Sequence, residues 1–168
     1  LRISPIKLGS EVVSAVISAT NITDREETTR ALQESEEKFR GIFENANDGI
    51  VLTDETGHVS AVNRSFENLF GVKRNDLLGI PLWIVHSLLM TETKMNPEFQ
   101  KDMEDSISSY FEKGDAAWLN VTTKGEFIHP ISGLQVWFEQ HSFRITSSRG
   151  TMLCSFVWDI TERTQNEE

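Results

Sequence analysis

The sequence predicts an α+β domain in which a five-stranded antiparallel sheet carries helices on one face and follows a connector helix. Three observations predict this fold class. Between residues 46 and 160, runs typical of strands and helices follow in the order two strands, short helices, one longer helix and three strands. A strand-to-helix junction occurs near each end of the chain. The last two strand-like runs have apolar residues on both faces in places, so the face of the sheet away from the helices must also be buried.

The two junctions indicate an internal repeat. Asn21-Ile22-Thr23-Asp24-Arg25 and Asp159-Ile160-Thr161-Glu162-Arg163 each follow an apolar run, with an offset of 138 residues between Ile22 and Ile160. That offset is the size of one ordinary domain. We therefore expect residues 1–22 to be the final hairpin of a preceding domain, 23–45 a connector helix, 46–160 a complete domain and 161–168 the start of an outgoing helix.

The hairpin in residues 1–22 needs a partner, because two isolated strands are marginal in water. It either belongs to a preceding domain or pairs with the intact domain or another chain. The connector helix follows with a capping box, Thr23-Asp24-Arg25-Glu26. Its thin apolar seam recurs every seven residues at Leu32, Phe39 and Ala46. Two interpretations remain open, a helix packed on its own domain and a two-stranded coiled coil that makes a homodimer.

The first half of the domain shows clear local signals. Residues 49–53 and 59–62 predict a hairpin around the turn Asp54-Glu55-Thr56-Gly57. Asn63 is expected to cap a short helix that ends at Gly71. A second short helical turn covers 75–78, and residues 80–90 are ambiguous. The clearest helix starts after the cap Asn96 and ends at Gly114.

Three longer strands are expected at residues 117–123, 134–145 and 151–160. The outer face of these strands must be covered by the connector helix or by another subunit. Trp137 and Trp158 are expected to lie on this outer face, because large aromatic residues on adjacent strands gain most from burial there.

Charge and cysteine content exclude several classes. The net charge is −10, and residues 24–48 hold eight acidic and four basic side chains, so neither nucleic acid nor an anionic membrane is an expected partner. A single cysteine, Cys154, excludes an intrachain disulfide and favours a cytoplasmic location. The longest apolar stretch, residues 80–90, is short of the roughly 20 residues that span a bilayer. Motifs of hydrolases and phosphate-binding loops are missing, so no catalytic residue and no enzyme activity are assigned to this fragment.

Several motifs together resemble a PAS domain, the small sensor module of signalling proteins such as histidine kinases and diguanylate cyclases. The order and spacing of these motifs carry the resemblance over residues 35–165, and residues 1–34 resemble the end of a preceding PAS domain with its joining helix. The motifs are Ser35-Glu36-Glu37-Lys38-Phe39-Arg40, Ile42-Phe43-Glu44-Asn45-Ala46, Asp48-Gly49-Ile50, Thr53-Asp54 with Gly57, Val62-Asn63-Arg64-Ser65-Phe66, Leu77-Leu78-Gly79 and Asp159-Ile160-Thr161-Glu162-Arg163.

The resemblance implies a sensory and relay function in a larger protein, most readily a sensor histidine kinase. A ligand or a partner would change the packing between helices and sheet, and the junction Asp159, Ile160 and Thr161 would transmit the change to the outgoing helix. The implied partners are a second copy, through the connector helix and the outer sheet face, and the adjacent domains of the parent protein. Alternatives are a ligand-free dimerising spacer, the PAS domain of a diguanylate cyclase, and a small-molecule enzyme on a related fold.

Candidate ligand-pocket residues are Trp83, His86 and Leu89 in the ambiguous stretch, with Met103 and Ile107 on the long helix. The cofactor is unknown. The resemblance implies that haem, where PAS domains hold it, is bound by a histidine on the long helix. Haem is not expected here, because residues 97–113 contain no histidine and a lone histidine such as His86 is more often a core residue than a ligand. The resemblance also implies that flavin would be attached to a cysteine on the helix after the first hairpin, and it is not expected either, since Cys154 lies on the last strand. His129 and His141 flank the hairpin over residues 130–140. They would not lie opposite one another in a register centred on Ser132-Gly133, so no metal site is assigned.

Overall fold

The computed structural model describes residues 2–9, 11–18, 23–89 and 97–167, and it divides into two compact units, Leu1–Arg40 and Gly41–Glu168. The first unit begins with the antiparallel strands β1 (Arg2–Leu8) and β2 (Glu11–Ser18). The helix α1 (Thr23–Asn45) follows and confirms that a helix precedes the sheet, whereas its role in connecting two domains stays a prediction. Asn21, Ile22, Asn96 and the side chain of Thr23 lie outside the described part of the chain.

The second unit contains the predicted five-stranded antiparallel sheet. Its strands are β3 (Gly49–Thr53), β4 (Val59–Val62), β5 (Thr122–Ile128), β6 (Gln135–Ser147) and β7 (Gly150–Asp159). They lie in the order β4-β3-β7-β6-β5, so the last strand in the chain occupies the centre of the sheet. Because β7 pairs with both β3 and β6, a shift of β7 would change its hydrogen bonds to both neighbouring strands.

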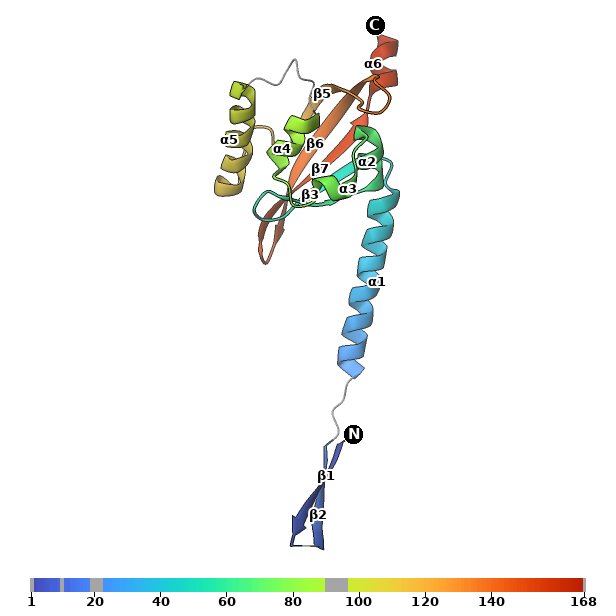
Figure 1. The fold of residues 1–168 in the computed structure, drawn as a ribbon, viewed down its shortest axis with the longest axis vertical. Helices are drawn as coiled ribbons and strands as arrows, with labels where there is room; N and C mark the ends of the chain where they lie inside the picture. Colours follow the sequence, from blue (N-terminus) through green and yellow to red (C-terminus); the bar gives the residue numbers. More distant parts are fainter. Residues whose placement is uncertain (1, 10, 19–22, 90–96, 168) are drawn as a thin grey trace. The chain divides into compact units, whose positions relative to one another are not determined.

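Four helices between β4 and β5 pack on the inner face of this sheet, as Figure 1 shows. They are α2 (Arg64–Phe70), α3 (Arg74–Leu77), α4 (Leu82–Leu89) and α5 (Pro97–Lys113). Asn63 caps α2 by accepting a hydrogen bond from the Phe66 backbone N–H, and Gly71 ends it at φ 65°, a conformation that glycine adopts without strain. The outgoing helix α6 (Thr161–Glu167) follows β7 directly. Among the described helices, none is both long and apolar enough to span a membrane.

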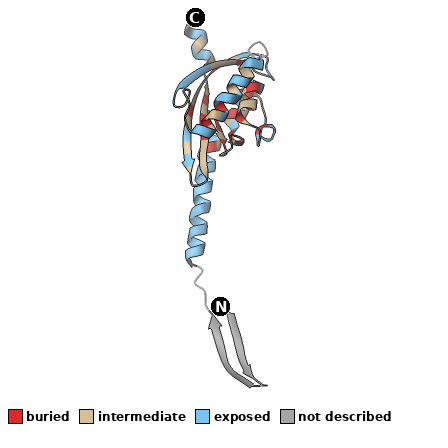
Figure 2. Ribbon diagram, turned by 90° about the vertical axis from the view of Figure 1, so that its left-hand side faces the viewer, coloured by how far each residue is buried: buried red, intermediate tan, exposed pale blue. Residues whose placement is uncertain are grey.

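The main core lies between these helices and the sheet, where the buried residues concentrate in Figure 2. Tyr110 of α5 and Val62 of β4 have no exposed surface, and Phe127, Leu153 and Val157 contribute from the other strands. Burial of such side chains is the dominant favourable contribution to folding, about 1.5 to 3 kcal/mol for each large one. The predicted α+β class, with helices on one face of the sheet, is confirmed.

The outer face of the sheet carries a second, smaller core. Phe43 from the last turn of α1 is buried together with Ile50 and Cys154, and Phe143 stacks on Phe156 nearby at a ring distance of 5.8 Å. The end of the connector helix therefore covers part of this face, which was one of the two covers predicted. Alternation along β6 and β7 places Trp137 and Trp158 on the same face, where both are half-buried.

The predicted strand over residues 117–123 is wrong. Residues 117–120 form turns, in which the Leu119 N–H donates to the Ala116 carbonyl, and Asn120 adopts a left-handed φ of 58°. The strand β5 starts only at Thr122 and continues to Ile128, through a segment expected to be a loop. Sequence reasoning missed it because β5 is an edge strand that begins with three exposed polar residues, Thr122, Thr123 and Lys124, so apolar alternation is almost lost.

Candidate functional site

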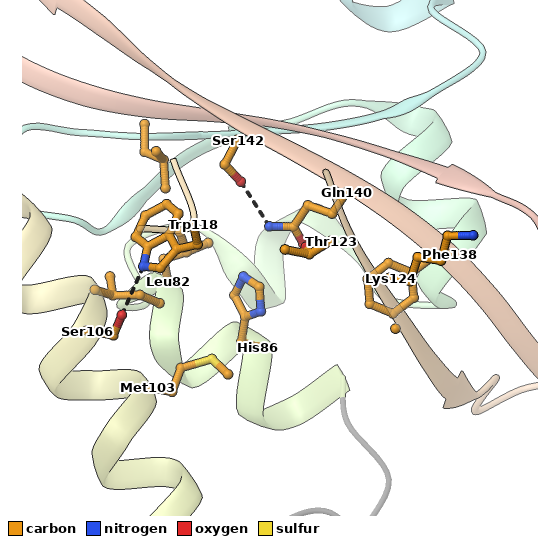
Figure 3. A pocket seen from close by; sticks show the side chains of 13 residues that line it. Leu82, His86, Met103, Ser106, Trp118, Thr123, Lys124, Phe138, Gln140 and Ser142 are labelled. Carbon is orange, nitrogen blue, oxygen red and sulfur yellow. Dashed lines mark hydrogen bonds between the residues drawn. The ribbon is translucent and has the colours of Figure 1, made fainter. Parts of the chain in front are cut away.

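A cavity of about 270 Å³ lies between α4, α5 and the inner face of strands β5 and β6. At roughly 30 Å³ for each water in the liquid, it has room for about nine water molecules. Its wall is mostly apolar, with a few polar side chains directed inward (Figure 3). Such a combination is typical of small-molecule sites. Its lining includes Leu82 and His86 from α4, Met103 and Ile107 from α5, and Phe138 and Gln140 from β6.

Three of the pocket residues proposed from the sequence line this cavity, namely His86, Met103 and Ile107. Leu89 lines a neighbouring cavity of only about 20 Å³, next to the same helix. Trp83 is not among the lining residues of either cavity and packs, partly buried, against the main core. Binding of a ligand by these residues stays a prediction.

Sequence reasoning missed other lining residues, above all Gln140, Ser142 and Trp118. The first two lie two and four residues after Phe138 on β6, so they share its inward face, and polar residues at inward positions were the signal that could have revealed them. Trp118 was missed because its segment was predicted to be a strand. In the structure its indole N–H donates to the Ser106 hydroxyl at 2.9 Å and holds the ring at the cavity wall.

His86 projects into the cavity from α4 (Figure 3). The His86 side chain keeps an intermediate exposed area, because one side of its ring faces the cavity. The other sides of the ring are surrounded by protein, which shields the imidazole from bulk water. Burial lowers the pKa of His86 to about 4, so the imidazole is neutral at pH 7. A neutral imidazole offers one N–H donor and one acceptor nitrogen.

A short polar network lies on the sheet side of the cavity. The Gln140 amide N–H donates to the Ser142 hydroxyl at 3.0 Å, and the Ser142 and Ser155 hydroxyls share a hydrogen bond of 2.7 Å. These contacts satisfy the two buried serines and fix the orientation of the Gln140 amide. No donor to its carbonyl oxygen is found among the described residues, so this oxygen is available to them as an acceptor.

Charge is almost absent from the cavity wall. Among the described lining residues only Lys124 carries a charge at neutral pH, and its ammonium lies 3.2 Å from the Glu139 carboxylate. Glu139 points to the outer face of the sheet, since it alternates with the inward residues Phe138 and Gln140. The lysine charge is therefore neutralised on the side of the sheet away from the cavity.

The predicted junction residues contact strand β6. The Ile160 N–H donates to the Trp137 carbonyl at 2.8 Å, and the Trp137 N–H donates to the Thr161 hydroxyl at 3.0 Å. The Asp159 carboxylate accepts a hydrogen bond from the Thr161 N–H at 2.8 Å, and Ile160 is buried. The start of α6 is thus attached to β6 next to two cavity residues, Phe138 and Gln140.

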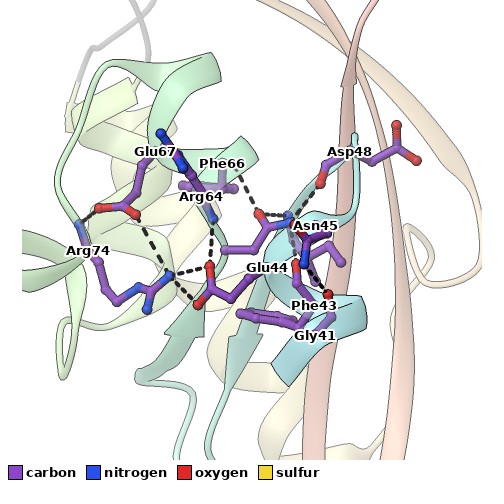
Figure 4. Close-up of polar contacts among 11 residues, drawn as sticks. Gly41, Phe43, Glu44, Asn45, Asp48, Arg64, Phe66, Glu67 and Arg74 are labelled. Carbon is purple, nitrogen blue, oxygen red and sulfur yellow. Dashed lines mark hydrogen bonds and ion pairs between the residues drawn. The ribbon is translucent and has the colours of Figure 1, made fainter. Parts of the chain in front are cut away.

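The end of α1 is attached to the same domain by polar contacts (Figure 4). The Asn63 amide donates to the backbone carbonyls of Phe43 and Asp48. The Arg74 guanidinium donates to both oxygens of Glu44, at 2.7 and 2.9 Å. The helix entering the domain is therefore held at α2 and α3, and the helix leaving it is held at β6.

Comparison with known proteins agrees with this fold. A family model described as PAS domain matches residues 37–103. The cell-division control histidine kinase PdhS of Brucella anthropi is 33% identical over 69 residues, which are 41% of this chain and only 6% of the kinase. This chain therefore aligns with a small part of that protein.

Two solved PAS domains share the fold. The PAS domain of an HTR-like protein from Haloarcula marismortui has a TM-score of 0.55 at 20% identity, over 80% of this chain and 99% of that domain. The PAS domain of BvgS from Bordetella pertussis has a TM-score of 0.52 at 17% identity, over 79% of this chain and 91% of that one. These similarities show that residues 41–168 have a PAS-like fold, and the PAS family model matches the chain over residues 37–103.

Proposed function

We propose that this PAS domain is a cytoplasmic sensory module of a sensor histidine kinase, and that it passes a change in its cavity to the outgoing helix α6. The observation that carries the proposal is the position of strand β6. Phe138 and Gln140 of this strand line the cavity. Trp137, the residue before Phe138, forms hydrogen bonds through its backbone with Ile160 and Thr161 at the start of α6. One strand therefore contacts both the cavity and the junction.

A relay of this kind needs two states that a ligand binds with different affinity. A ligand that pushes on Phe138 or Gln140 displaces β6 relative to β7. The hydrogen bonds that join Trp137 to Ile160 and Thr161 then either follow this displacement or break, and both outcomes change the orientation of α6. Asp159 acts by holding the first turn of α6 through the Thr161 N–H.

The kinase parent is supported by the similarity to the histidine kinase PdhS over 69 residues. These residues are only 6% of that protein, so the kinase activity belongs to the proposal. In such a parent, the outgoing helix would carry the signal to the domains that follow.

Met103→Trp tests the relay without a ligand. Met103 lines the cavity, so the larger tryptophan side chain would fill part of it and take the place of a bound molecule. We expect hydrogen exchange at the Ile160 and Thr164 amides to change at least about threefold. Adding Thr161→Val should abolish the change at Thr164, because the contact with Trp137 is lost. Thr146→Val, an exposed threonine on the same strand, is the matched control.

The relay is refuted if Met103→Trp alters exchange at cavity residues and leaves α6 unchanged. In the full-length parent, autophosphorylation should follow the same pattern, with Asp159→Ala and Thr161→Val uncoupling it from the cavity variant. Equal autophosphorylation responses in the presence and absence of these substitutions would contradict the role of the junction.

The proposal includes a homodimer through α1 and the outer sheet face. On α1, Leu32 and Phe39 are seven residues apart and are 60% and 56% exposed, so both present apolar surface on one side of the helix. Leu32→Glu with Phe39→Glu is expected to raise the dissociation constant at least about tenfold in sedimentation equilibrium. Gln33→Glu, on another side of the helix, should leave it unchanged.

A further inference from the structure

We infer that the cavity takes an uncharged, mostly apolar small molecule whose one polar edge both donates and accepts hydrogen bonds, as a carboxamide does. The inference rests on the proposed function, since it names the chemical class of the ligand that the sensory module would bind. It is carried by the arrangement of the cavity wall, in which His86 of α4 and Gln140 of β6 both face a mostly apolar space (Figure 3), while the Lys124 ammonium is paired with Glu139.

The size of the cavity limits the ligand. A volume of about 270 Å³ accommodates a single substituted ring or a short chain, and little more. The apolar wall formed by Leu82, Met103 and Ile107 suits the body of such a molecule. Contact with these side chains would remove apolar surface from water on both partners, which is the main source of affinity in small sites.

The polar edge of the ligand would meet His86 and Gln140. Within the described part of the chain, the imidazole of His86 has no hydrogen-bond partner, although the ring projects into the cavity (Figure 3). The ring is neutral at pH 7, so it supplies one donor and one acceptor. The Gln140 carbonyl adds a second acceptor, because only the amide N–H of this residue is committed to Ser142. A carboxamide can pair with such a set, whereas a hydrocarbon would leave it unpaired.

Charged ligands are disfavoured by the same wall. An anion would need a cation, but the Lys124 ammonium is paired with Glu139 on the outer face. A cation would need a carboxylate, and none of the described lining residues has one. Moving an unpaired charge into this cavity would cost more free energy than the apolar contacts return.

Four ligands of similar shape test this inference on the whole chain: benzamide, benzoate, benzamidine and toluene. Binding is followed by amide shifts in nitrogen–proton correlation spectra at pH 7.5. Benzamide is expected to bind with a dissociation constant of about 1 mM and to shift the amides of Gly125, Gln140 and Ile107. Benzoate, benzamidine and toluene should bind at least about tenfold more weakly.

The side-chain assignment is tested by His86→Leu, which should weaken benzamide at least about fivefold while leaving toluene binding unchanged or tighter. His141→Leu, a half-buried histidine on the outer face of β6, is the matched control and should bind benzamide like the unaltered chain. The comparison of the four ligands requires no variant, so it holds if His86→Leu does not fold.

Any charged ligand that binds as tightly as benzamide overturns the inference, and so does toluene binding as tightly. Absence of binding by all four ligands overturns it as well. These outcomes differ from failure of the proposed function, because the Met103→Trp exchange experiment uses no ligand. Conversely, benzamide that binds the cavity but leaves exchange in α6 unchanged would support the ligand class and contradict the relay.

Discussion

At the scale of single residues, Asn63 joins three parts of the domain. Its side-chain oxygen accepts hydrogen bonds from the backbone N–H groups of Ile50 and Phe66, and its amide donates to the carbonyls of Phe43 and Asp48. The side chain is fully buried. One asparagine thus forms hydrogen bonds with the start of α2, the start of β3 and the end of α1.

Asn63→Ala is expected to lower the free energy of unfolding by about 2 to 4 kcal/mol, because it removes a helix cap and leaves buried backbone groups without partners. Urea unfolding followed by circular dichroism measures this change. Asn68→Ala, at an exposed position of the same helix, should stay within about 0.5 kcal/mol of the unaltered chain. Equal stability of the two variants would refute this role of Asn63.

His86 makes stability depend on pH. Its pKa is about 4 in the folded chain and about 6.5 when unfolded, so between these values the unfolded chain binds more protons. The contribution of His86 is therefore fully present above pH 6.5 and is lost as the pH falls toward 4. We expect a loss on the order of 2 to 3 kcal/mol across this window.

The measurement compares urea unfolding at pH 7 and pH 4.5 for the unaltered chain and for His86→Leu, which cancels the titration of the carboxylates. The unaltered chain should lose more stability than the variant, whereas His141→Leu should behave like the unaltered chain. A pH dependence that is the same in all three proteins would contradict the buried neutral imidazole.

At the scale of elements, the last turn of α1 shows how one residue separates core from surface. Phe43 is 7% exposed and packs in the outer core with Cys154, whereas its neighbour Ile42 is 75% exposed. Burial raises the pKa of the Cys154 thiol to about 11, so very little thiolate forms at neutral pH. The thiol can therefore report on whether this turn of α1 stays in place.

Phe43→Ala is expected to increase the rate of Cys154 labelling by a disulfide reagent at pH 8 at least about tenfold, because its outer-core cover becomes smaller. The substitution should also lower the free energy of unfolding by about 3 to 5 kcal/mol. Ile42→Ala is the adjacent control, and its labelling rate should equal that of the unaltered chain. Equal labelling of both variants would mean that α1 does not protect Cys154.

At the scale of the whole molecule, the two compact units differ in how their strands are supported. The strands β1 and β2 form a two-stranded sheet, while β6 and β7 lie within the five-stranded sheet over a packed core. Two strands alone are marginally stable in water. The first unit should therefore open far more often than the second.

Native-state hydrogen exchange measures this difference. Protection of amides in β6 and β7 should exceed that in β1 and β2 at least about a hundredfold. The hairpin of β3 and β4 is the internal control, because it has the same local pairing but belongs to the larger sheet, and its amides should resemble those of β6. Similar protection in both units would indicate that the first hairpin is paired with a partner.

Local signals in the sequence determined much of this protein. The hairpin of β3 and β4, the cap at Asn63, the end of α2 at Gly71 and the junction at Asp159 and Thr161 all depend on residues close together in the chain. Turn and cap chemistry acts over a few residues, so a single sequence is sufficient to predict it. Their order also predicted the PAS fold.

Tertiary structure alone decided the cavity. Gln140 and Trp118 come to it from segments whose position depends on pairing between β5 and β6, and β5 itself lacks the apolar alternation that marks a strand. The burial of Phe43 beside an exposed Ile42 was equally undecided by helix periodicity, because it depends on where the helix meets the sheet. Contacts between residues distant in the chain set these features, and local propensity carries no information about them.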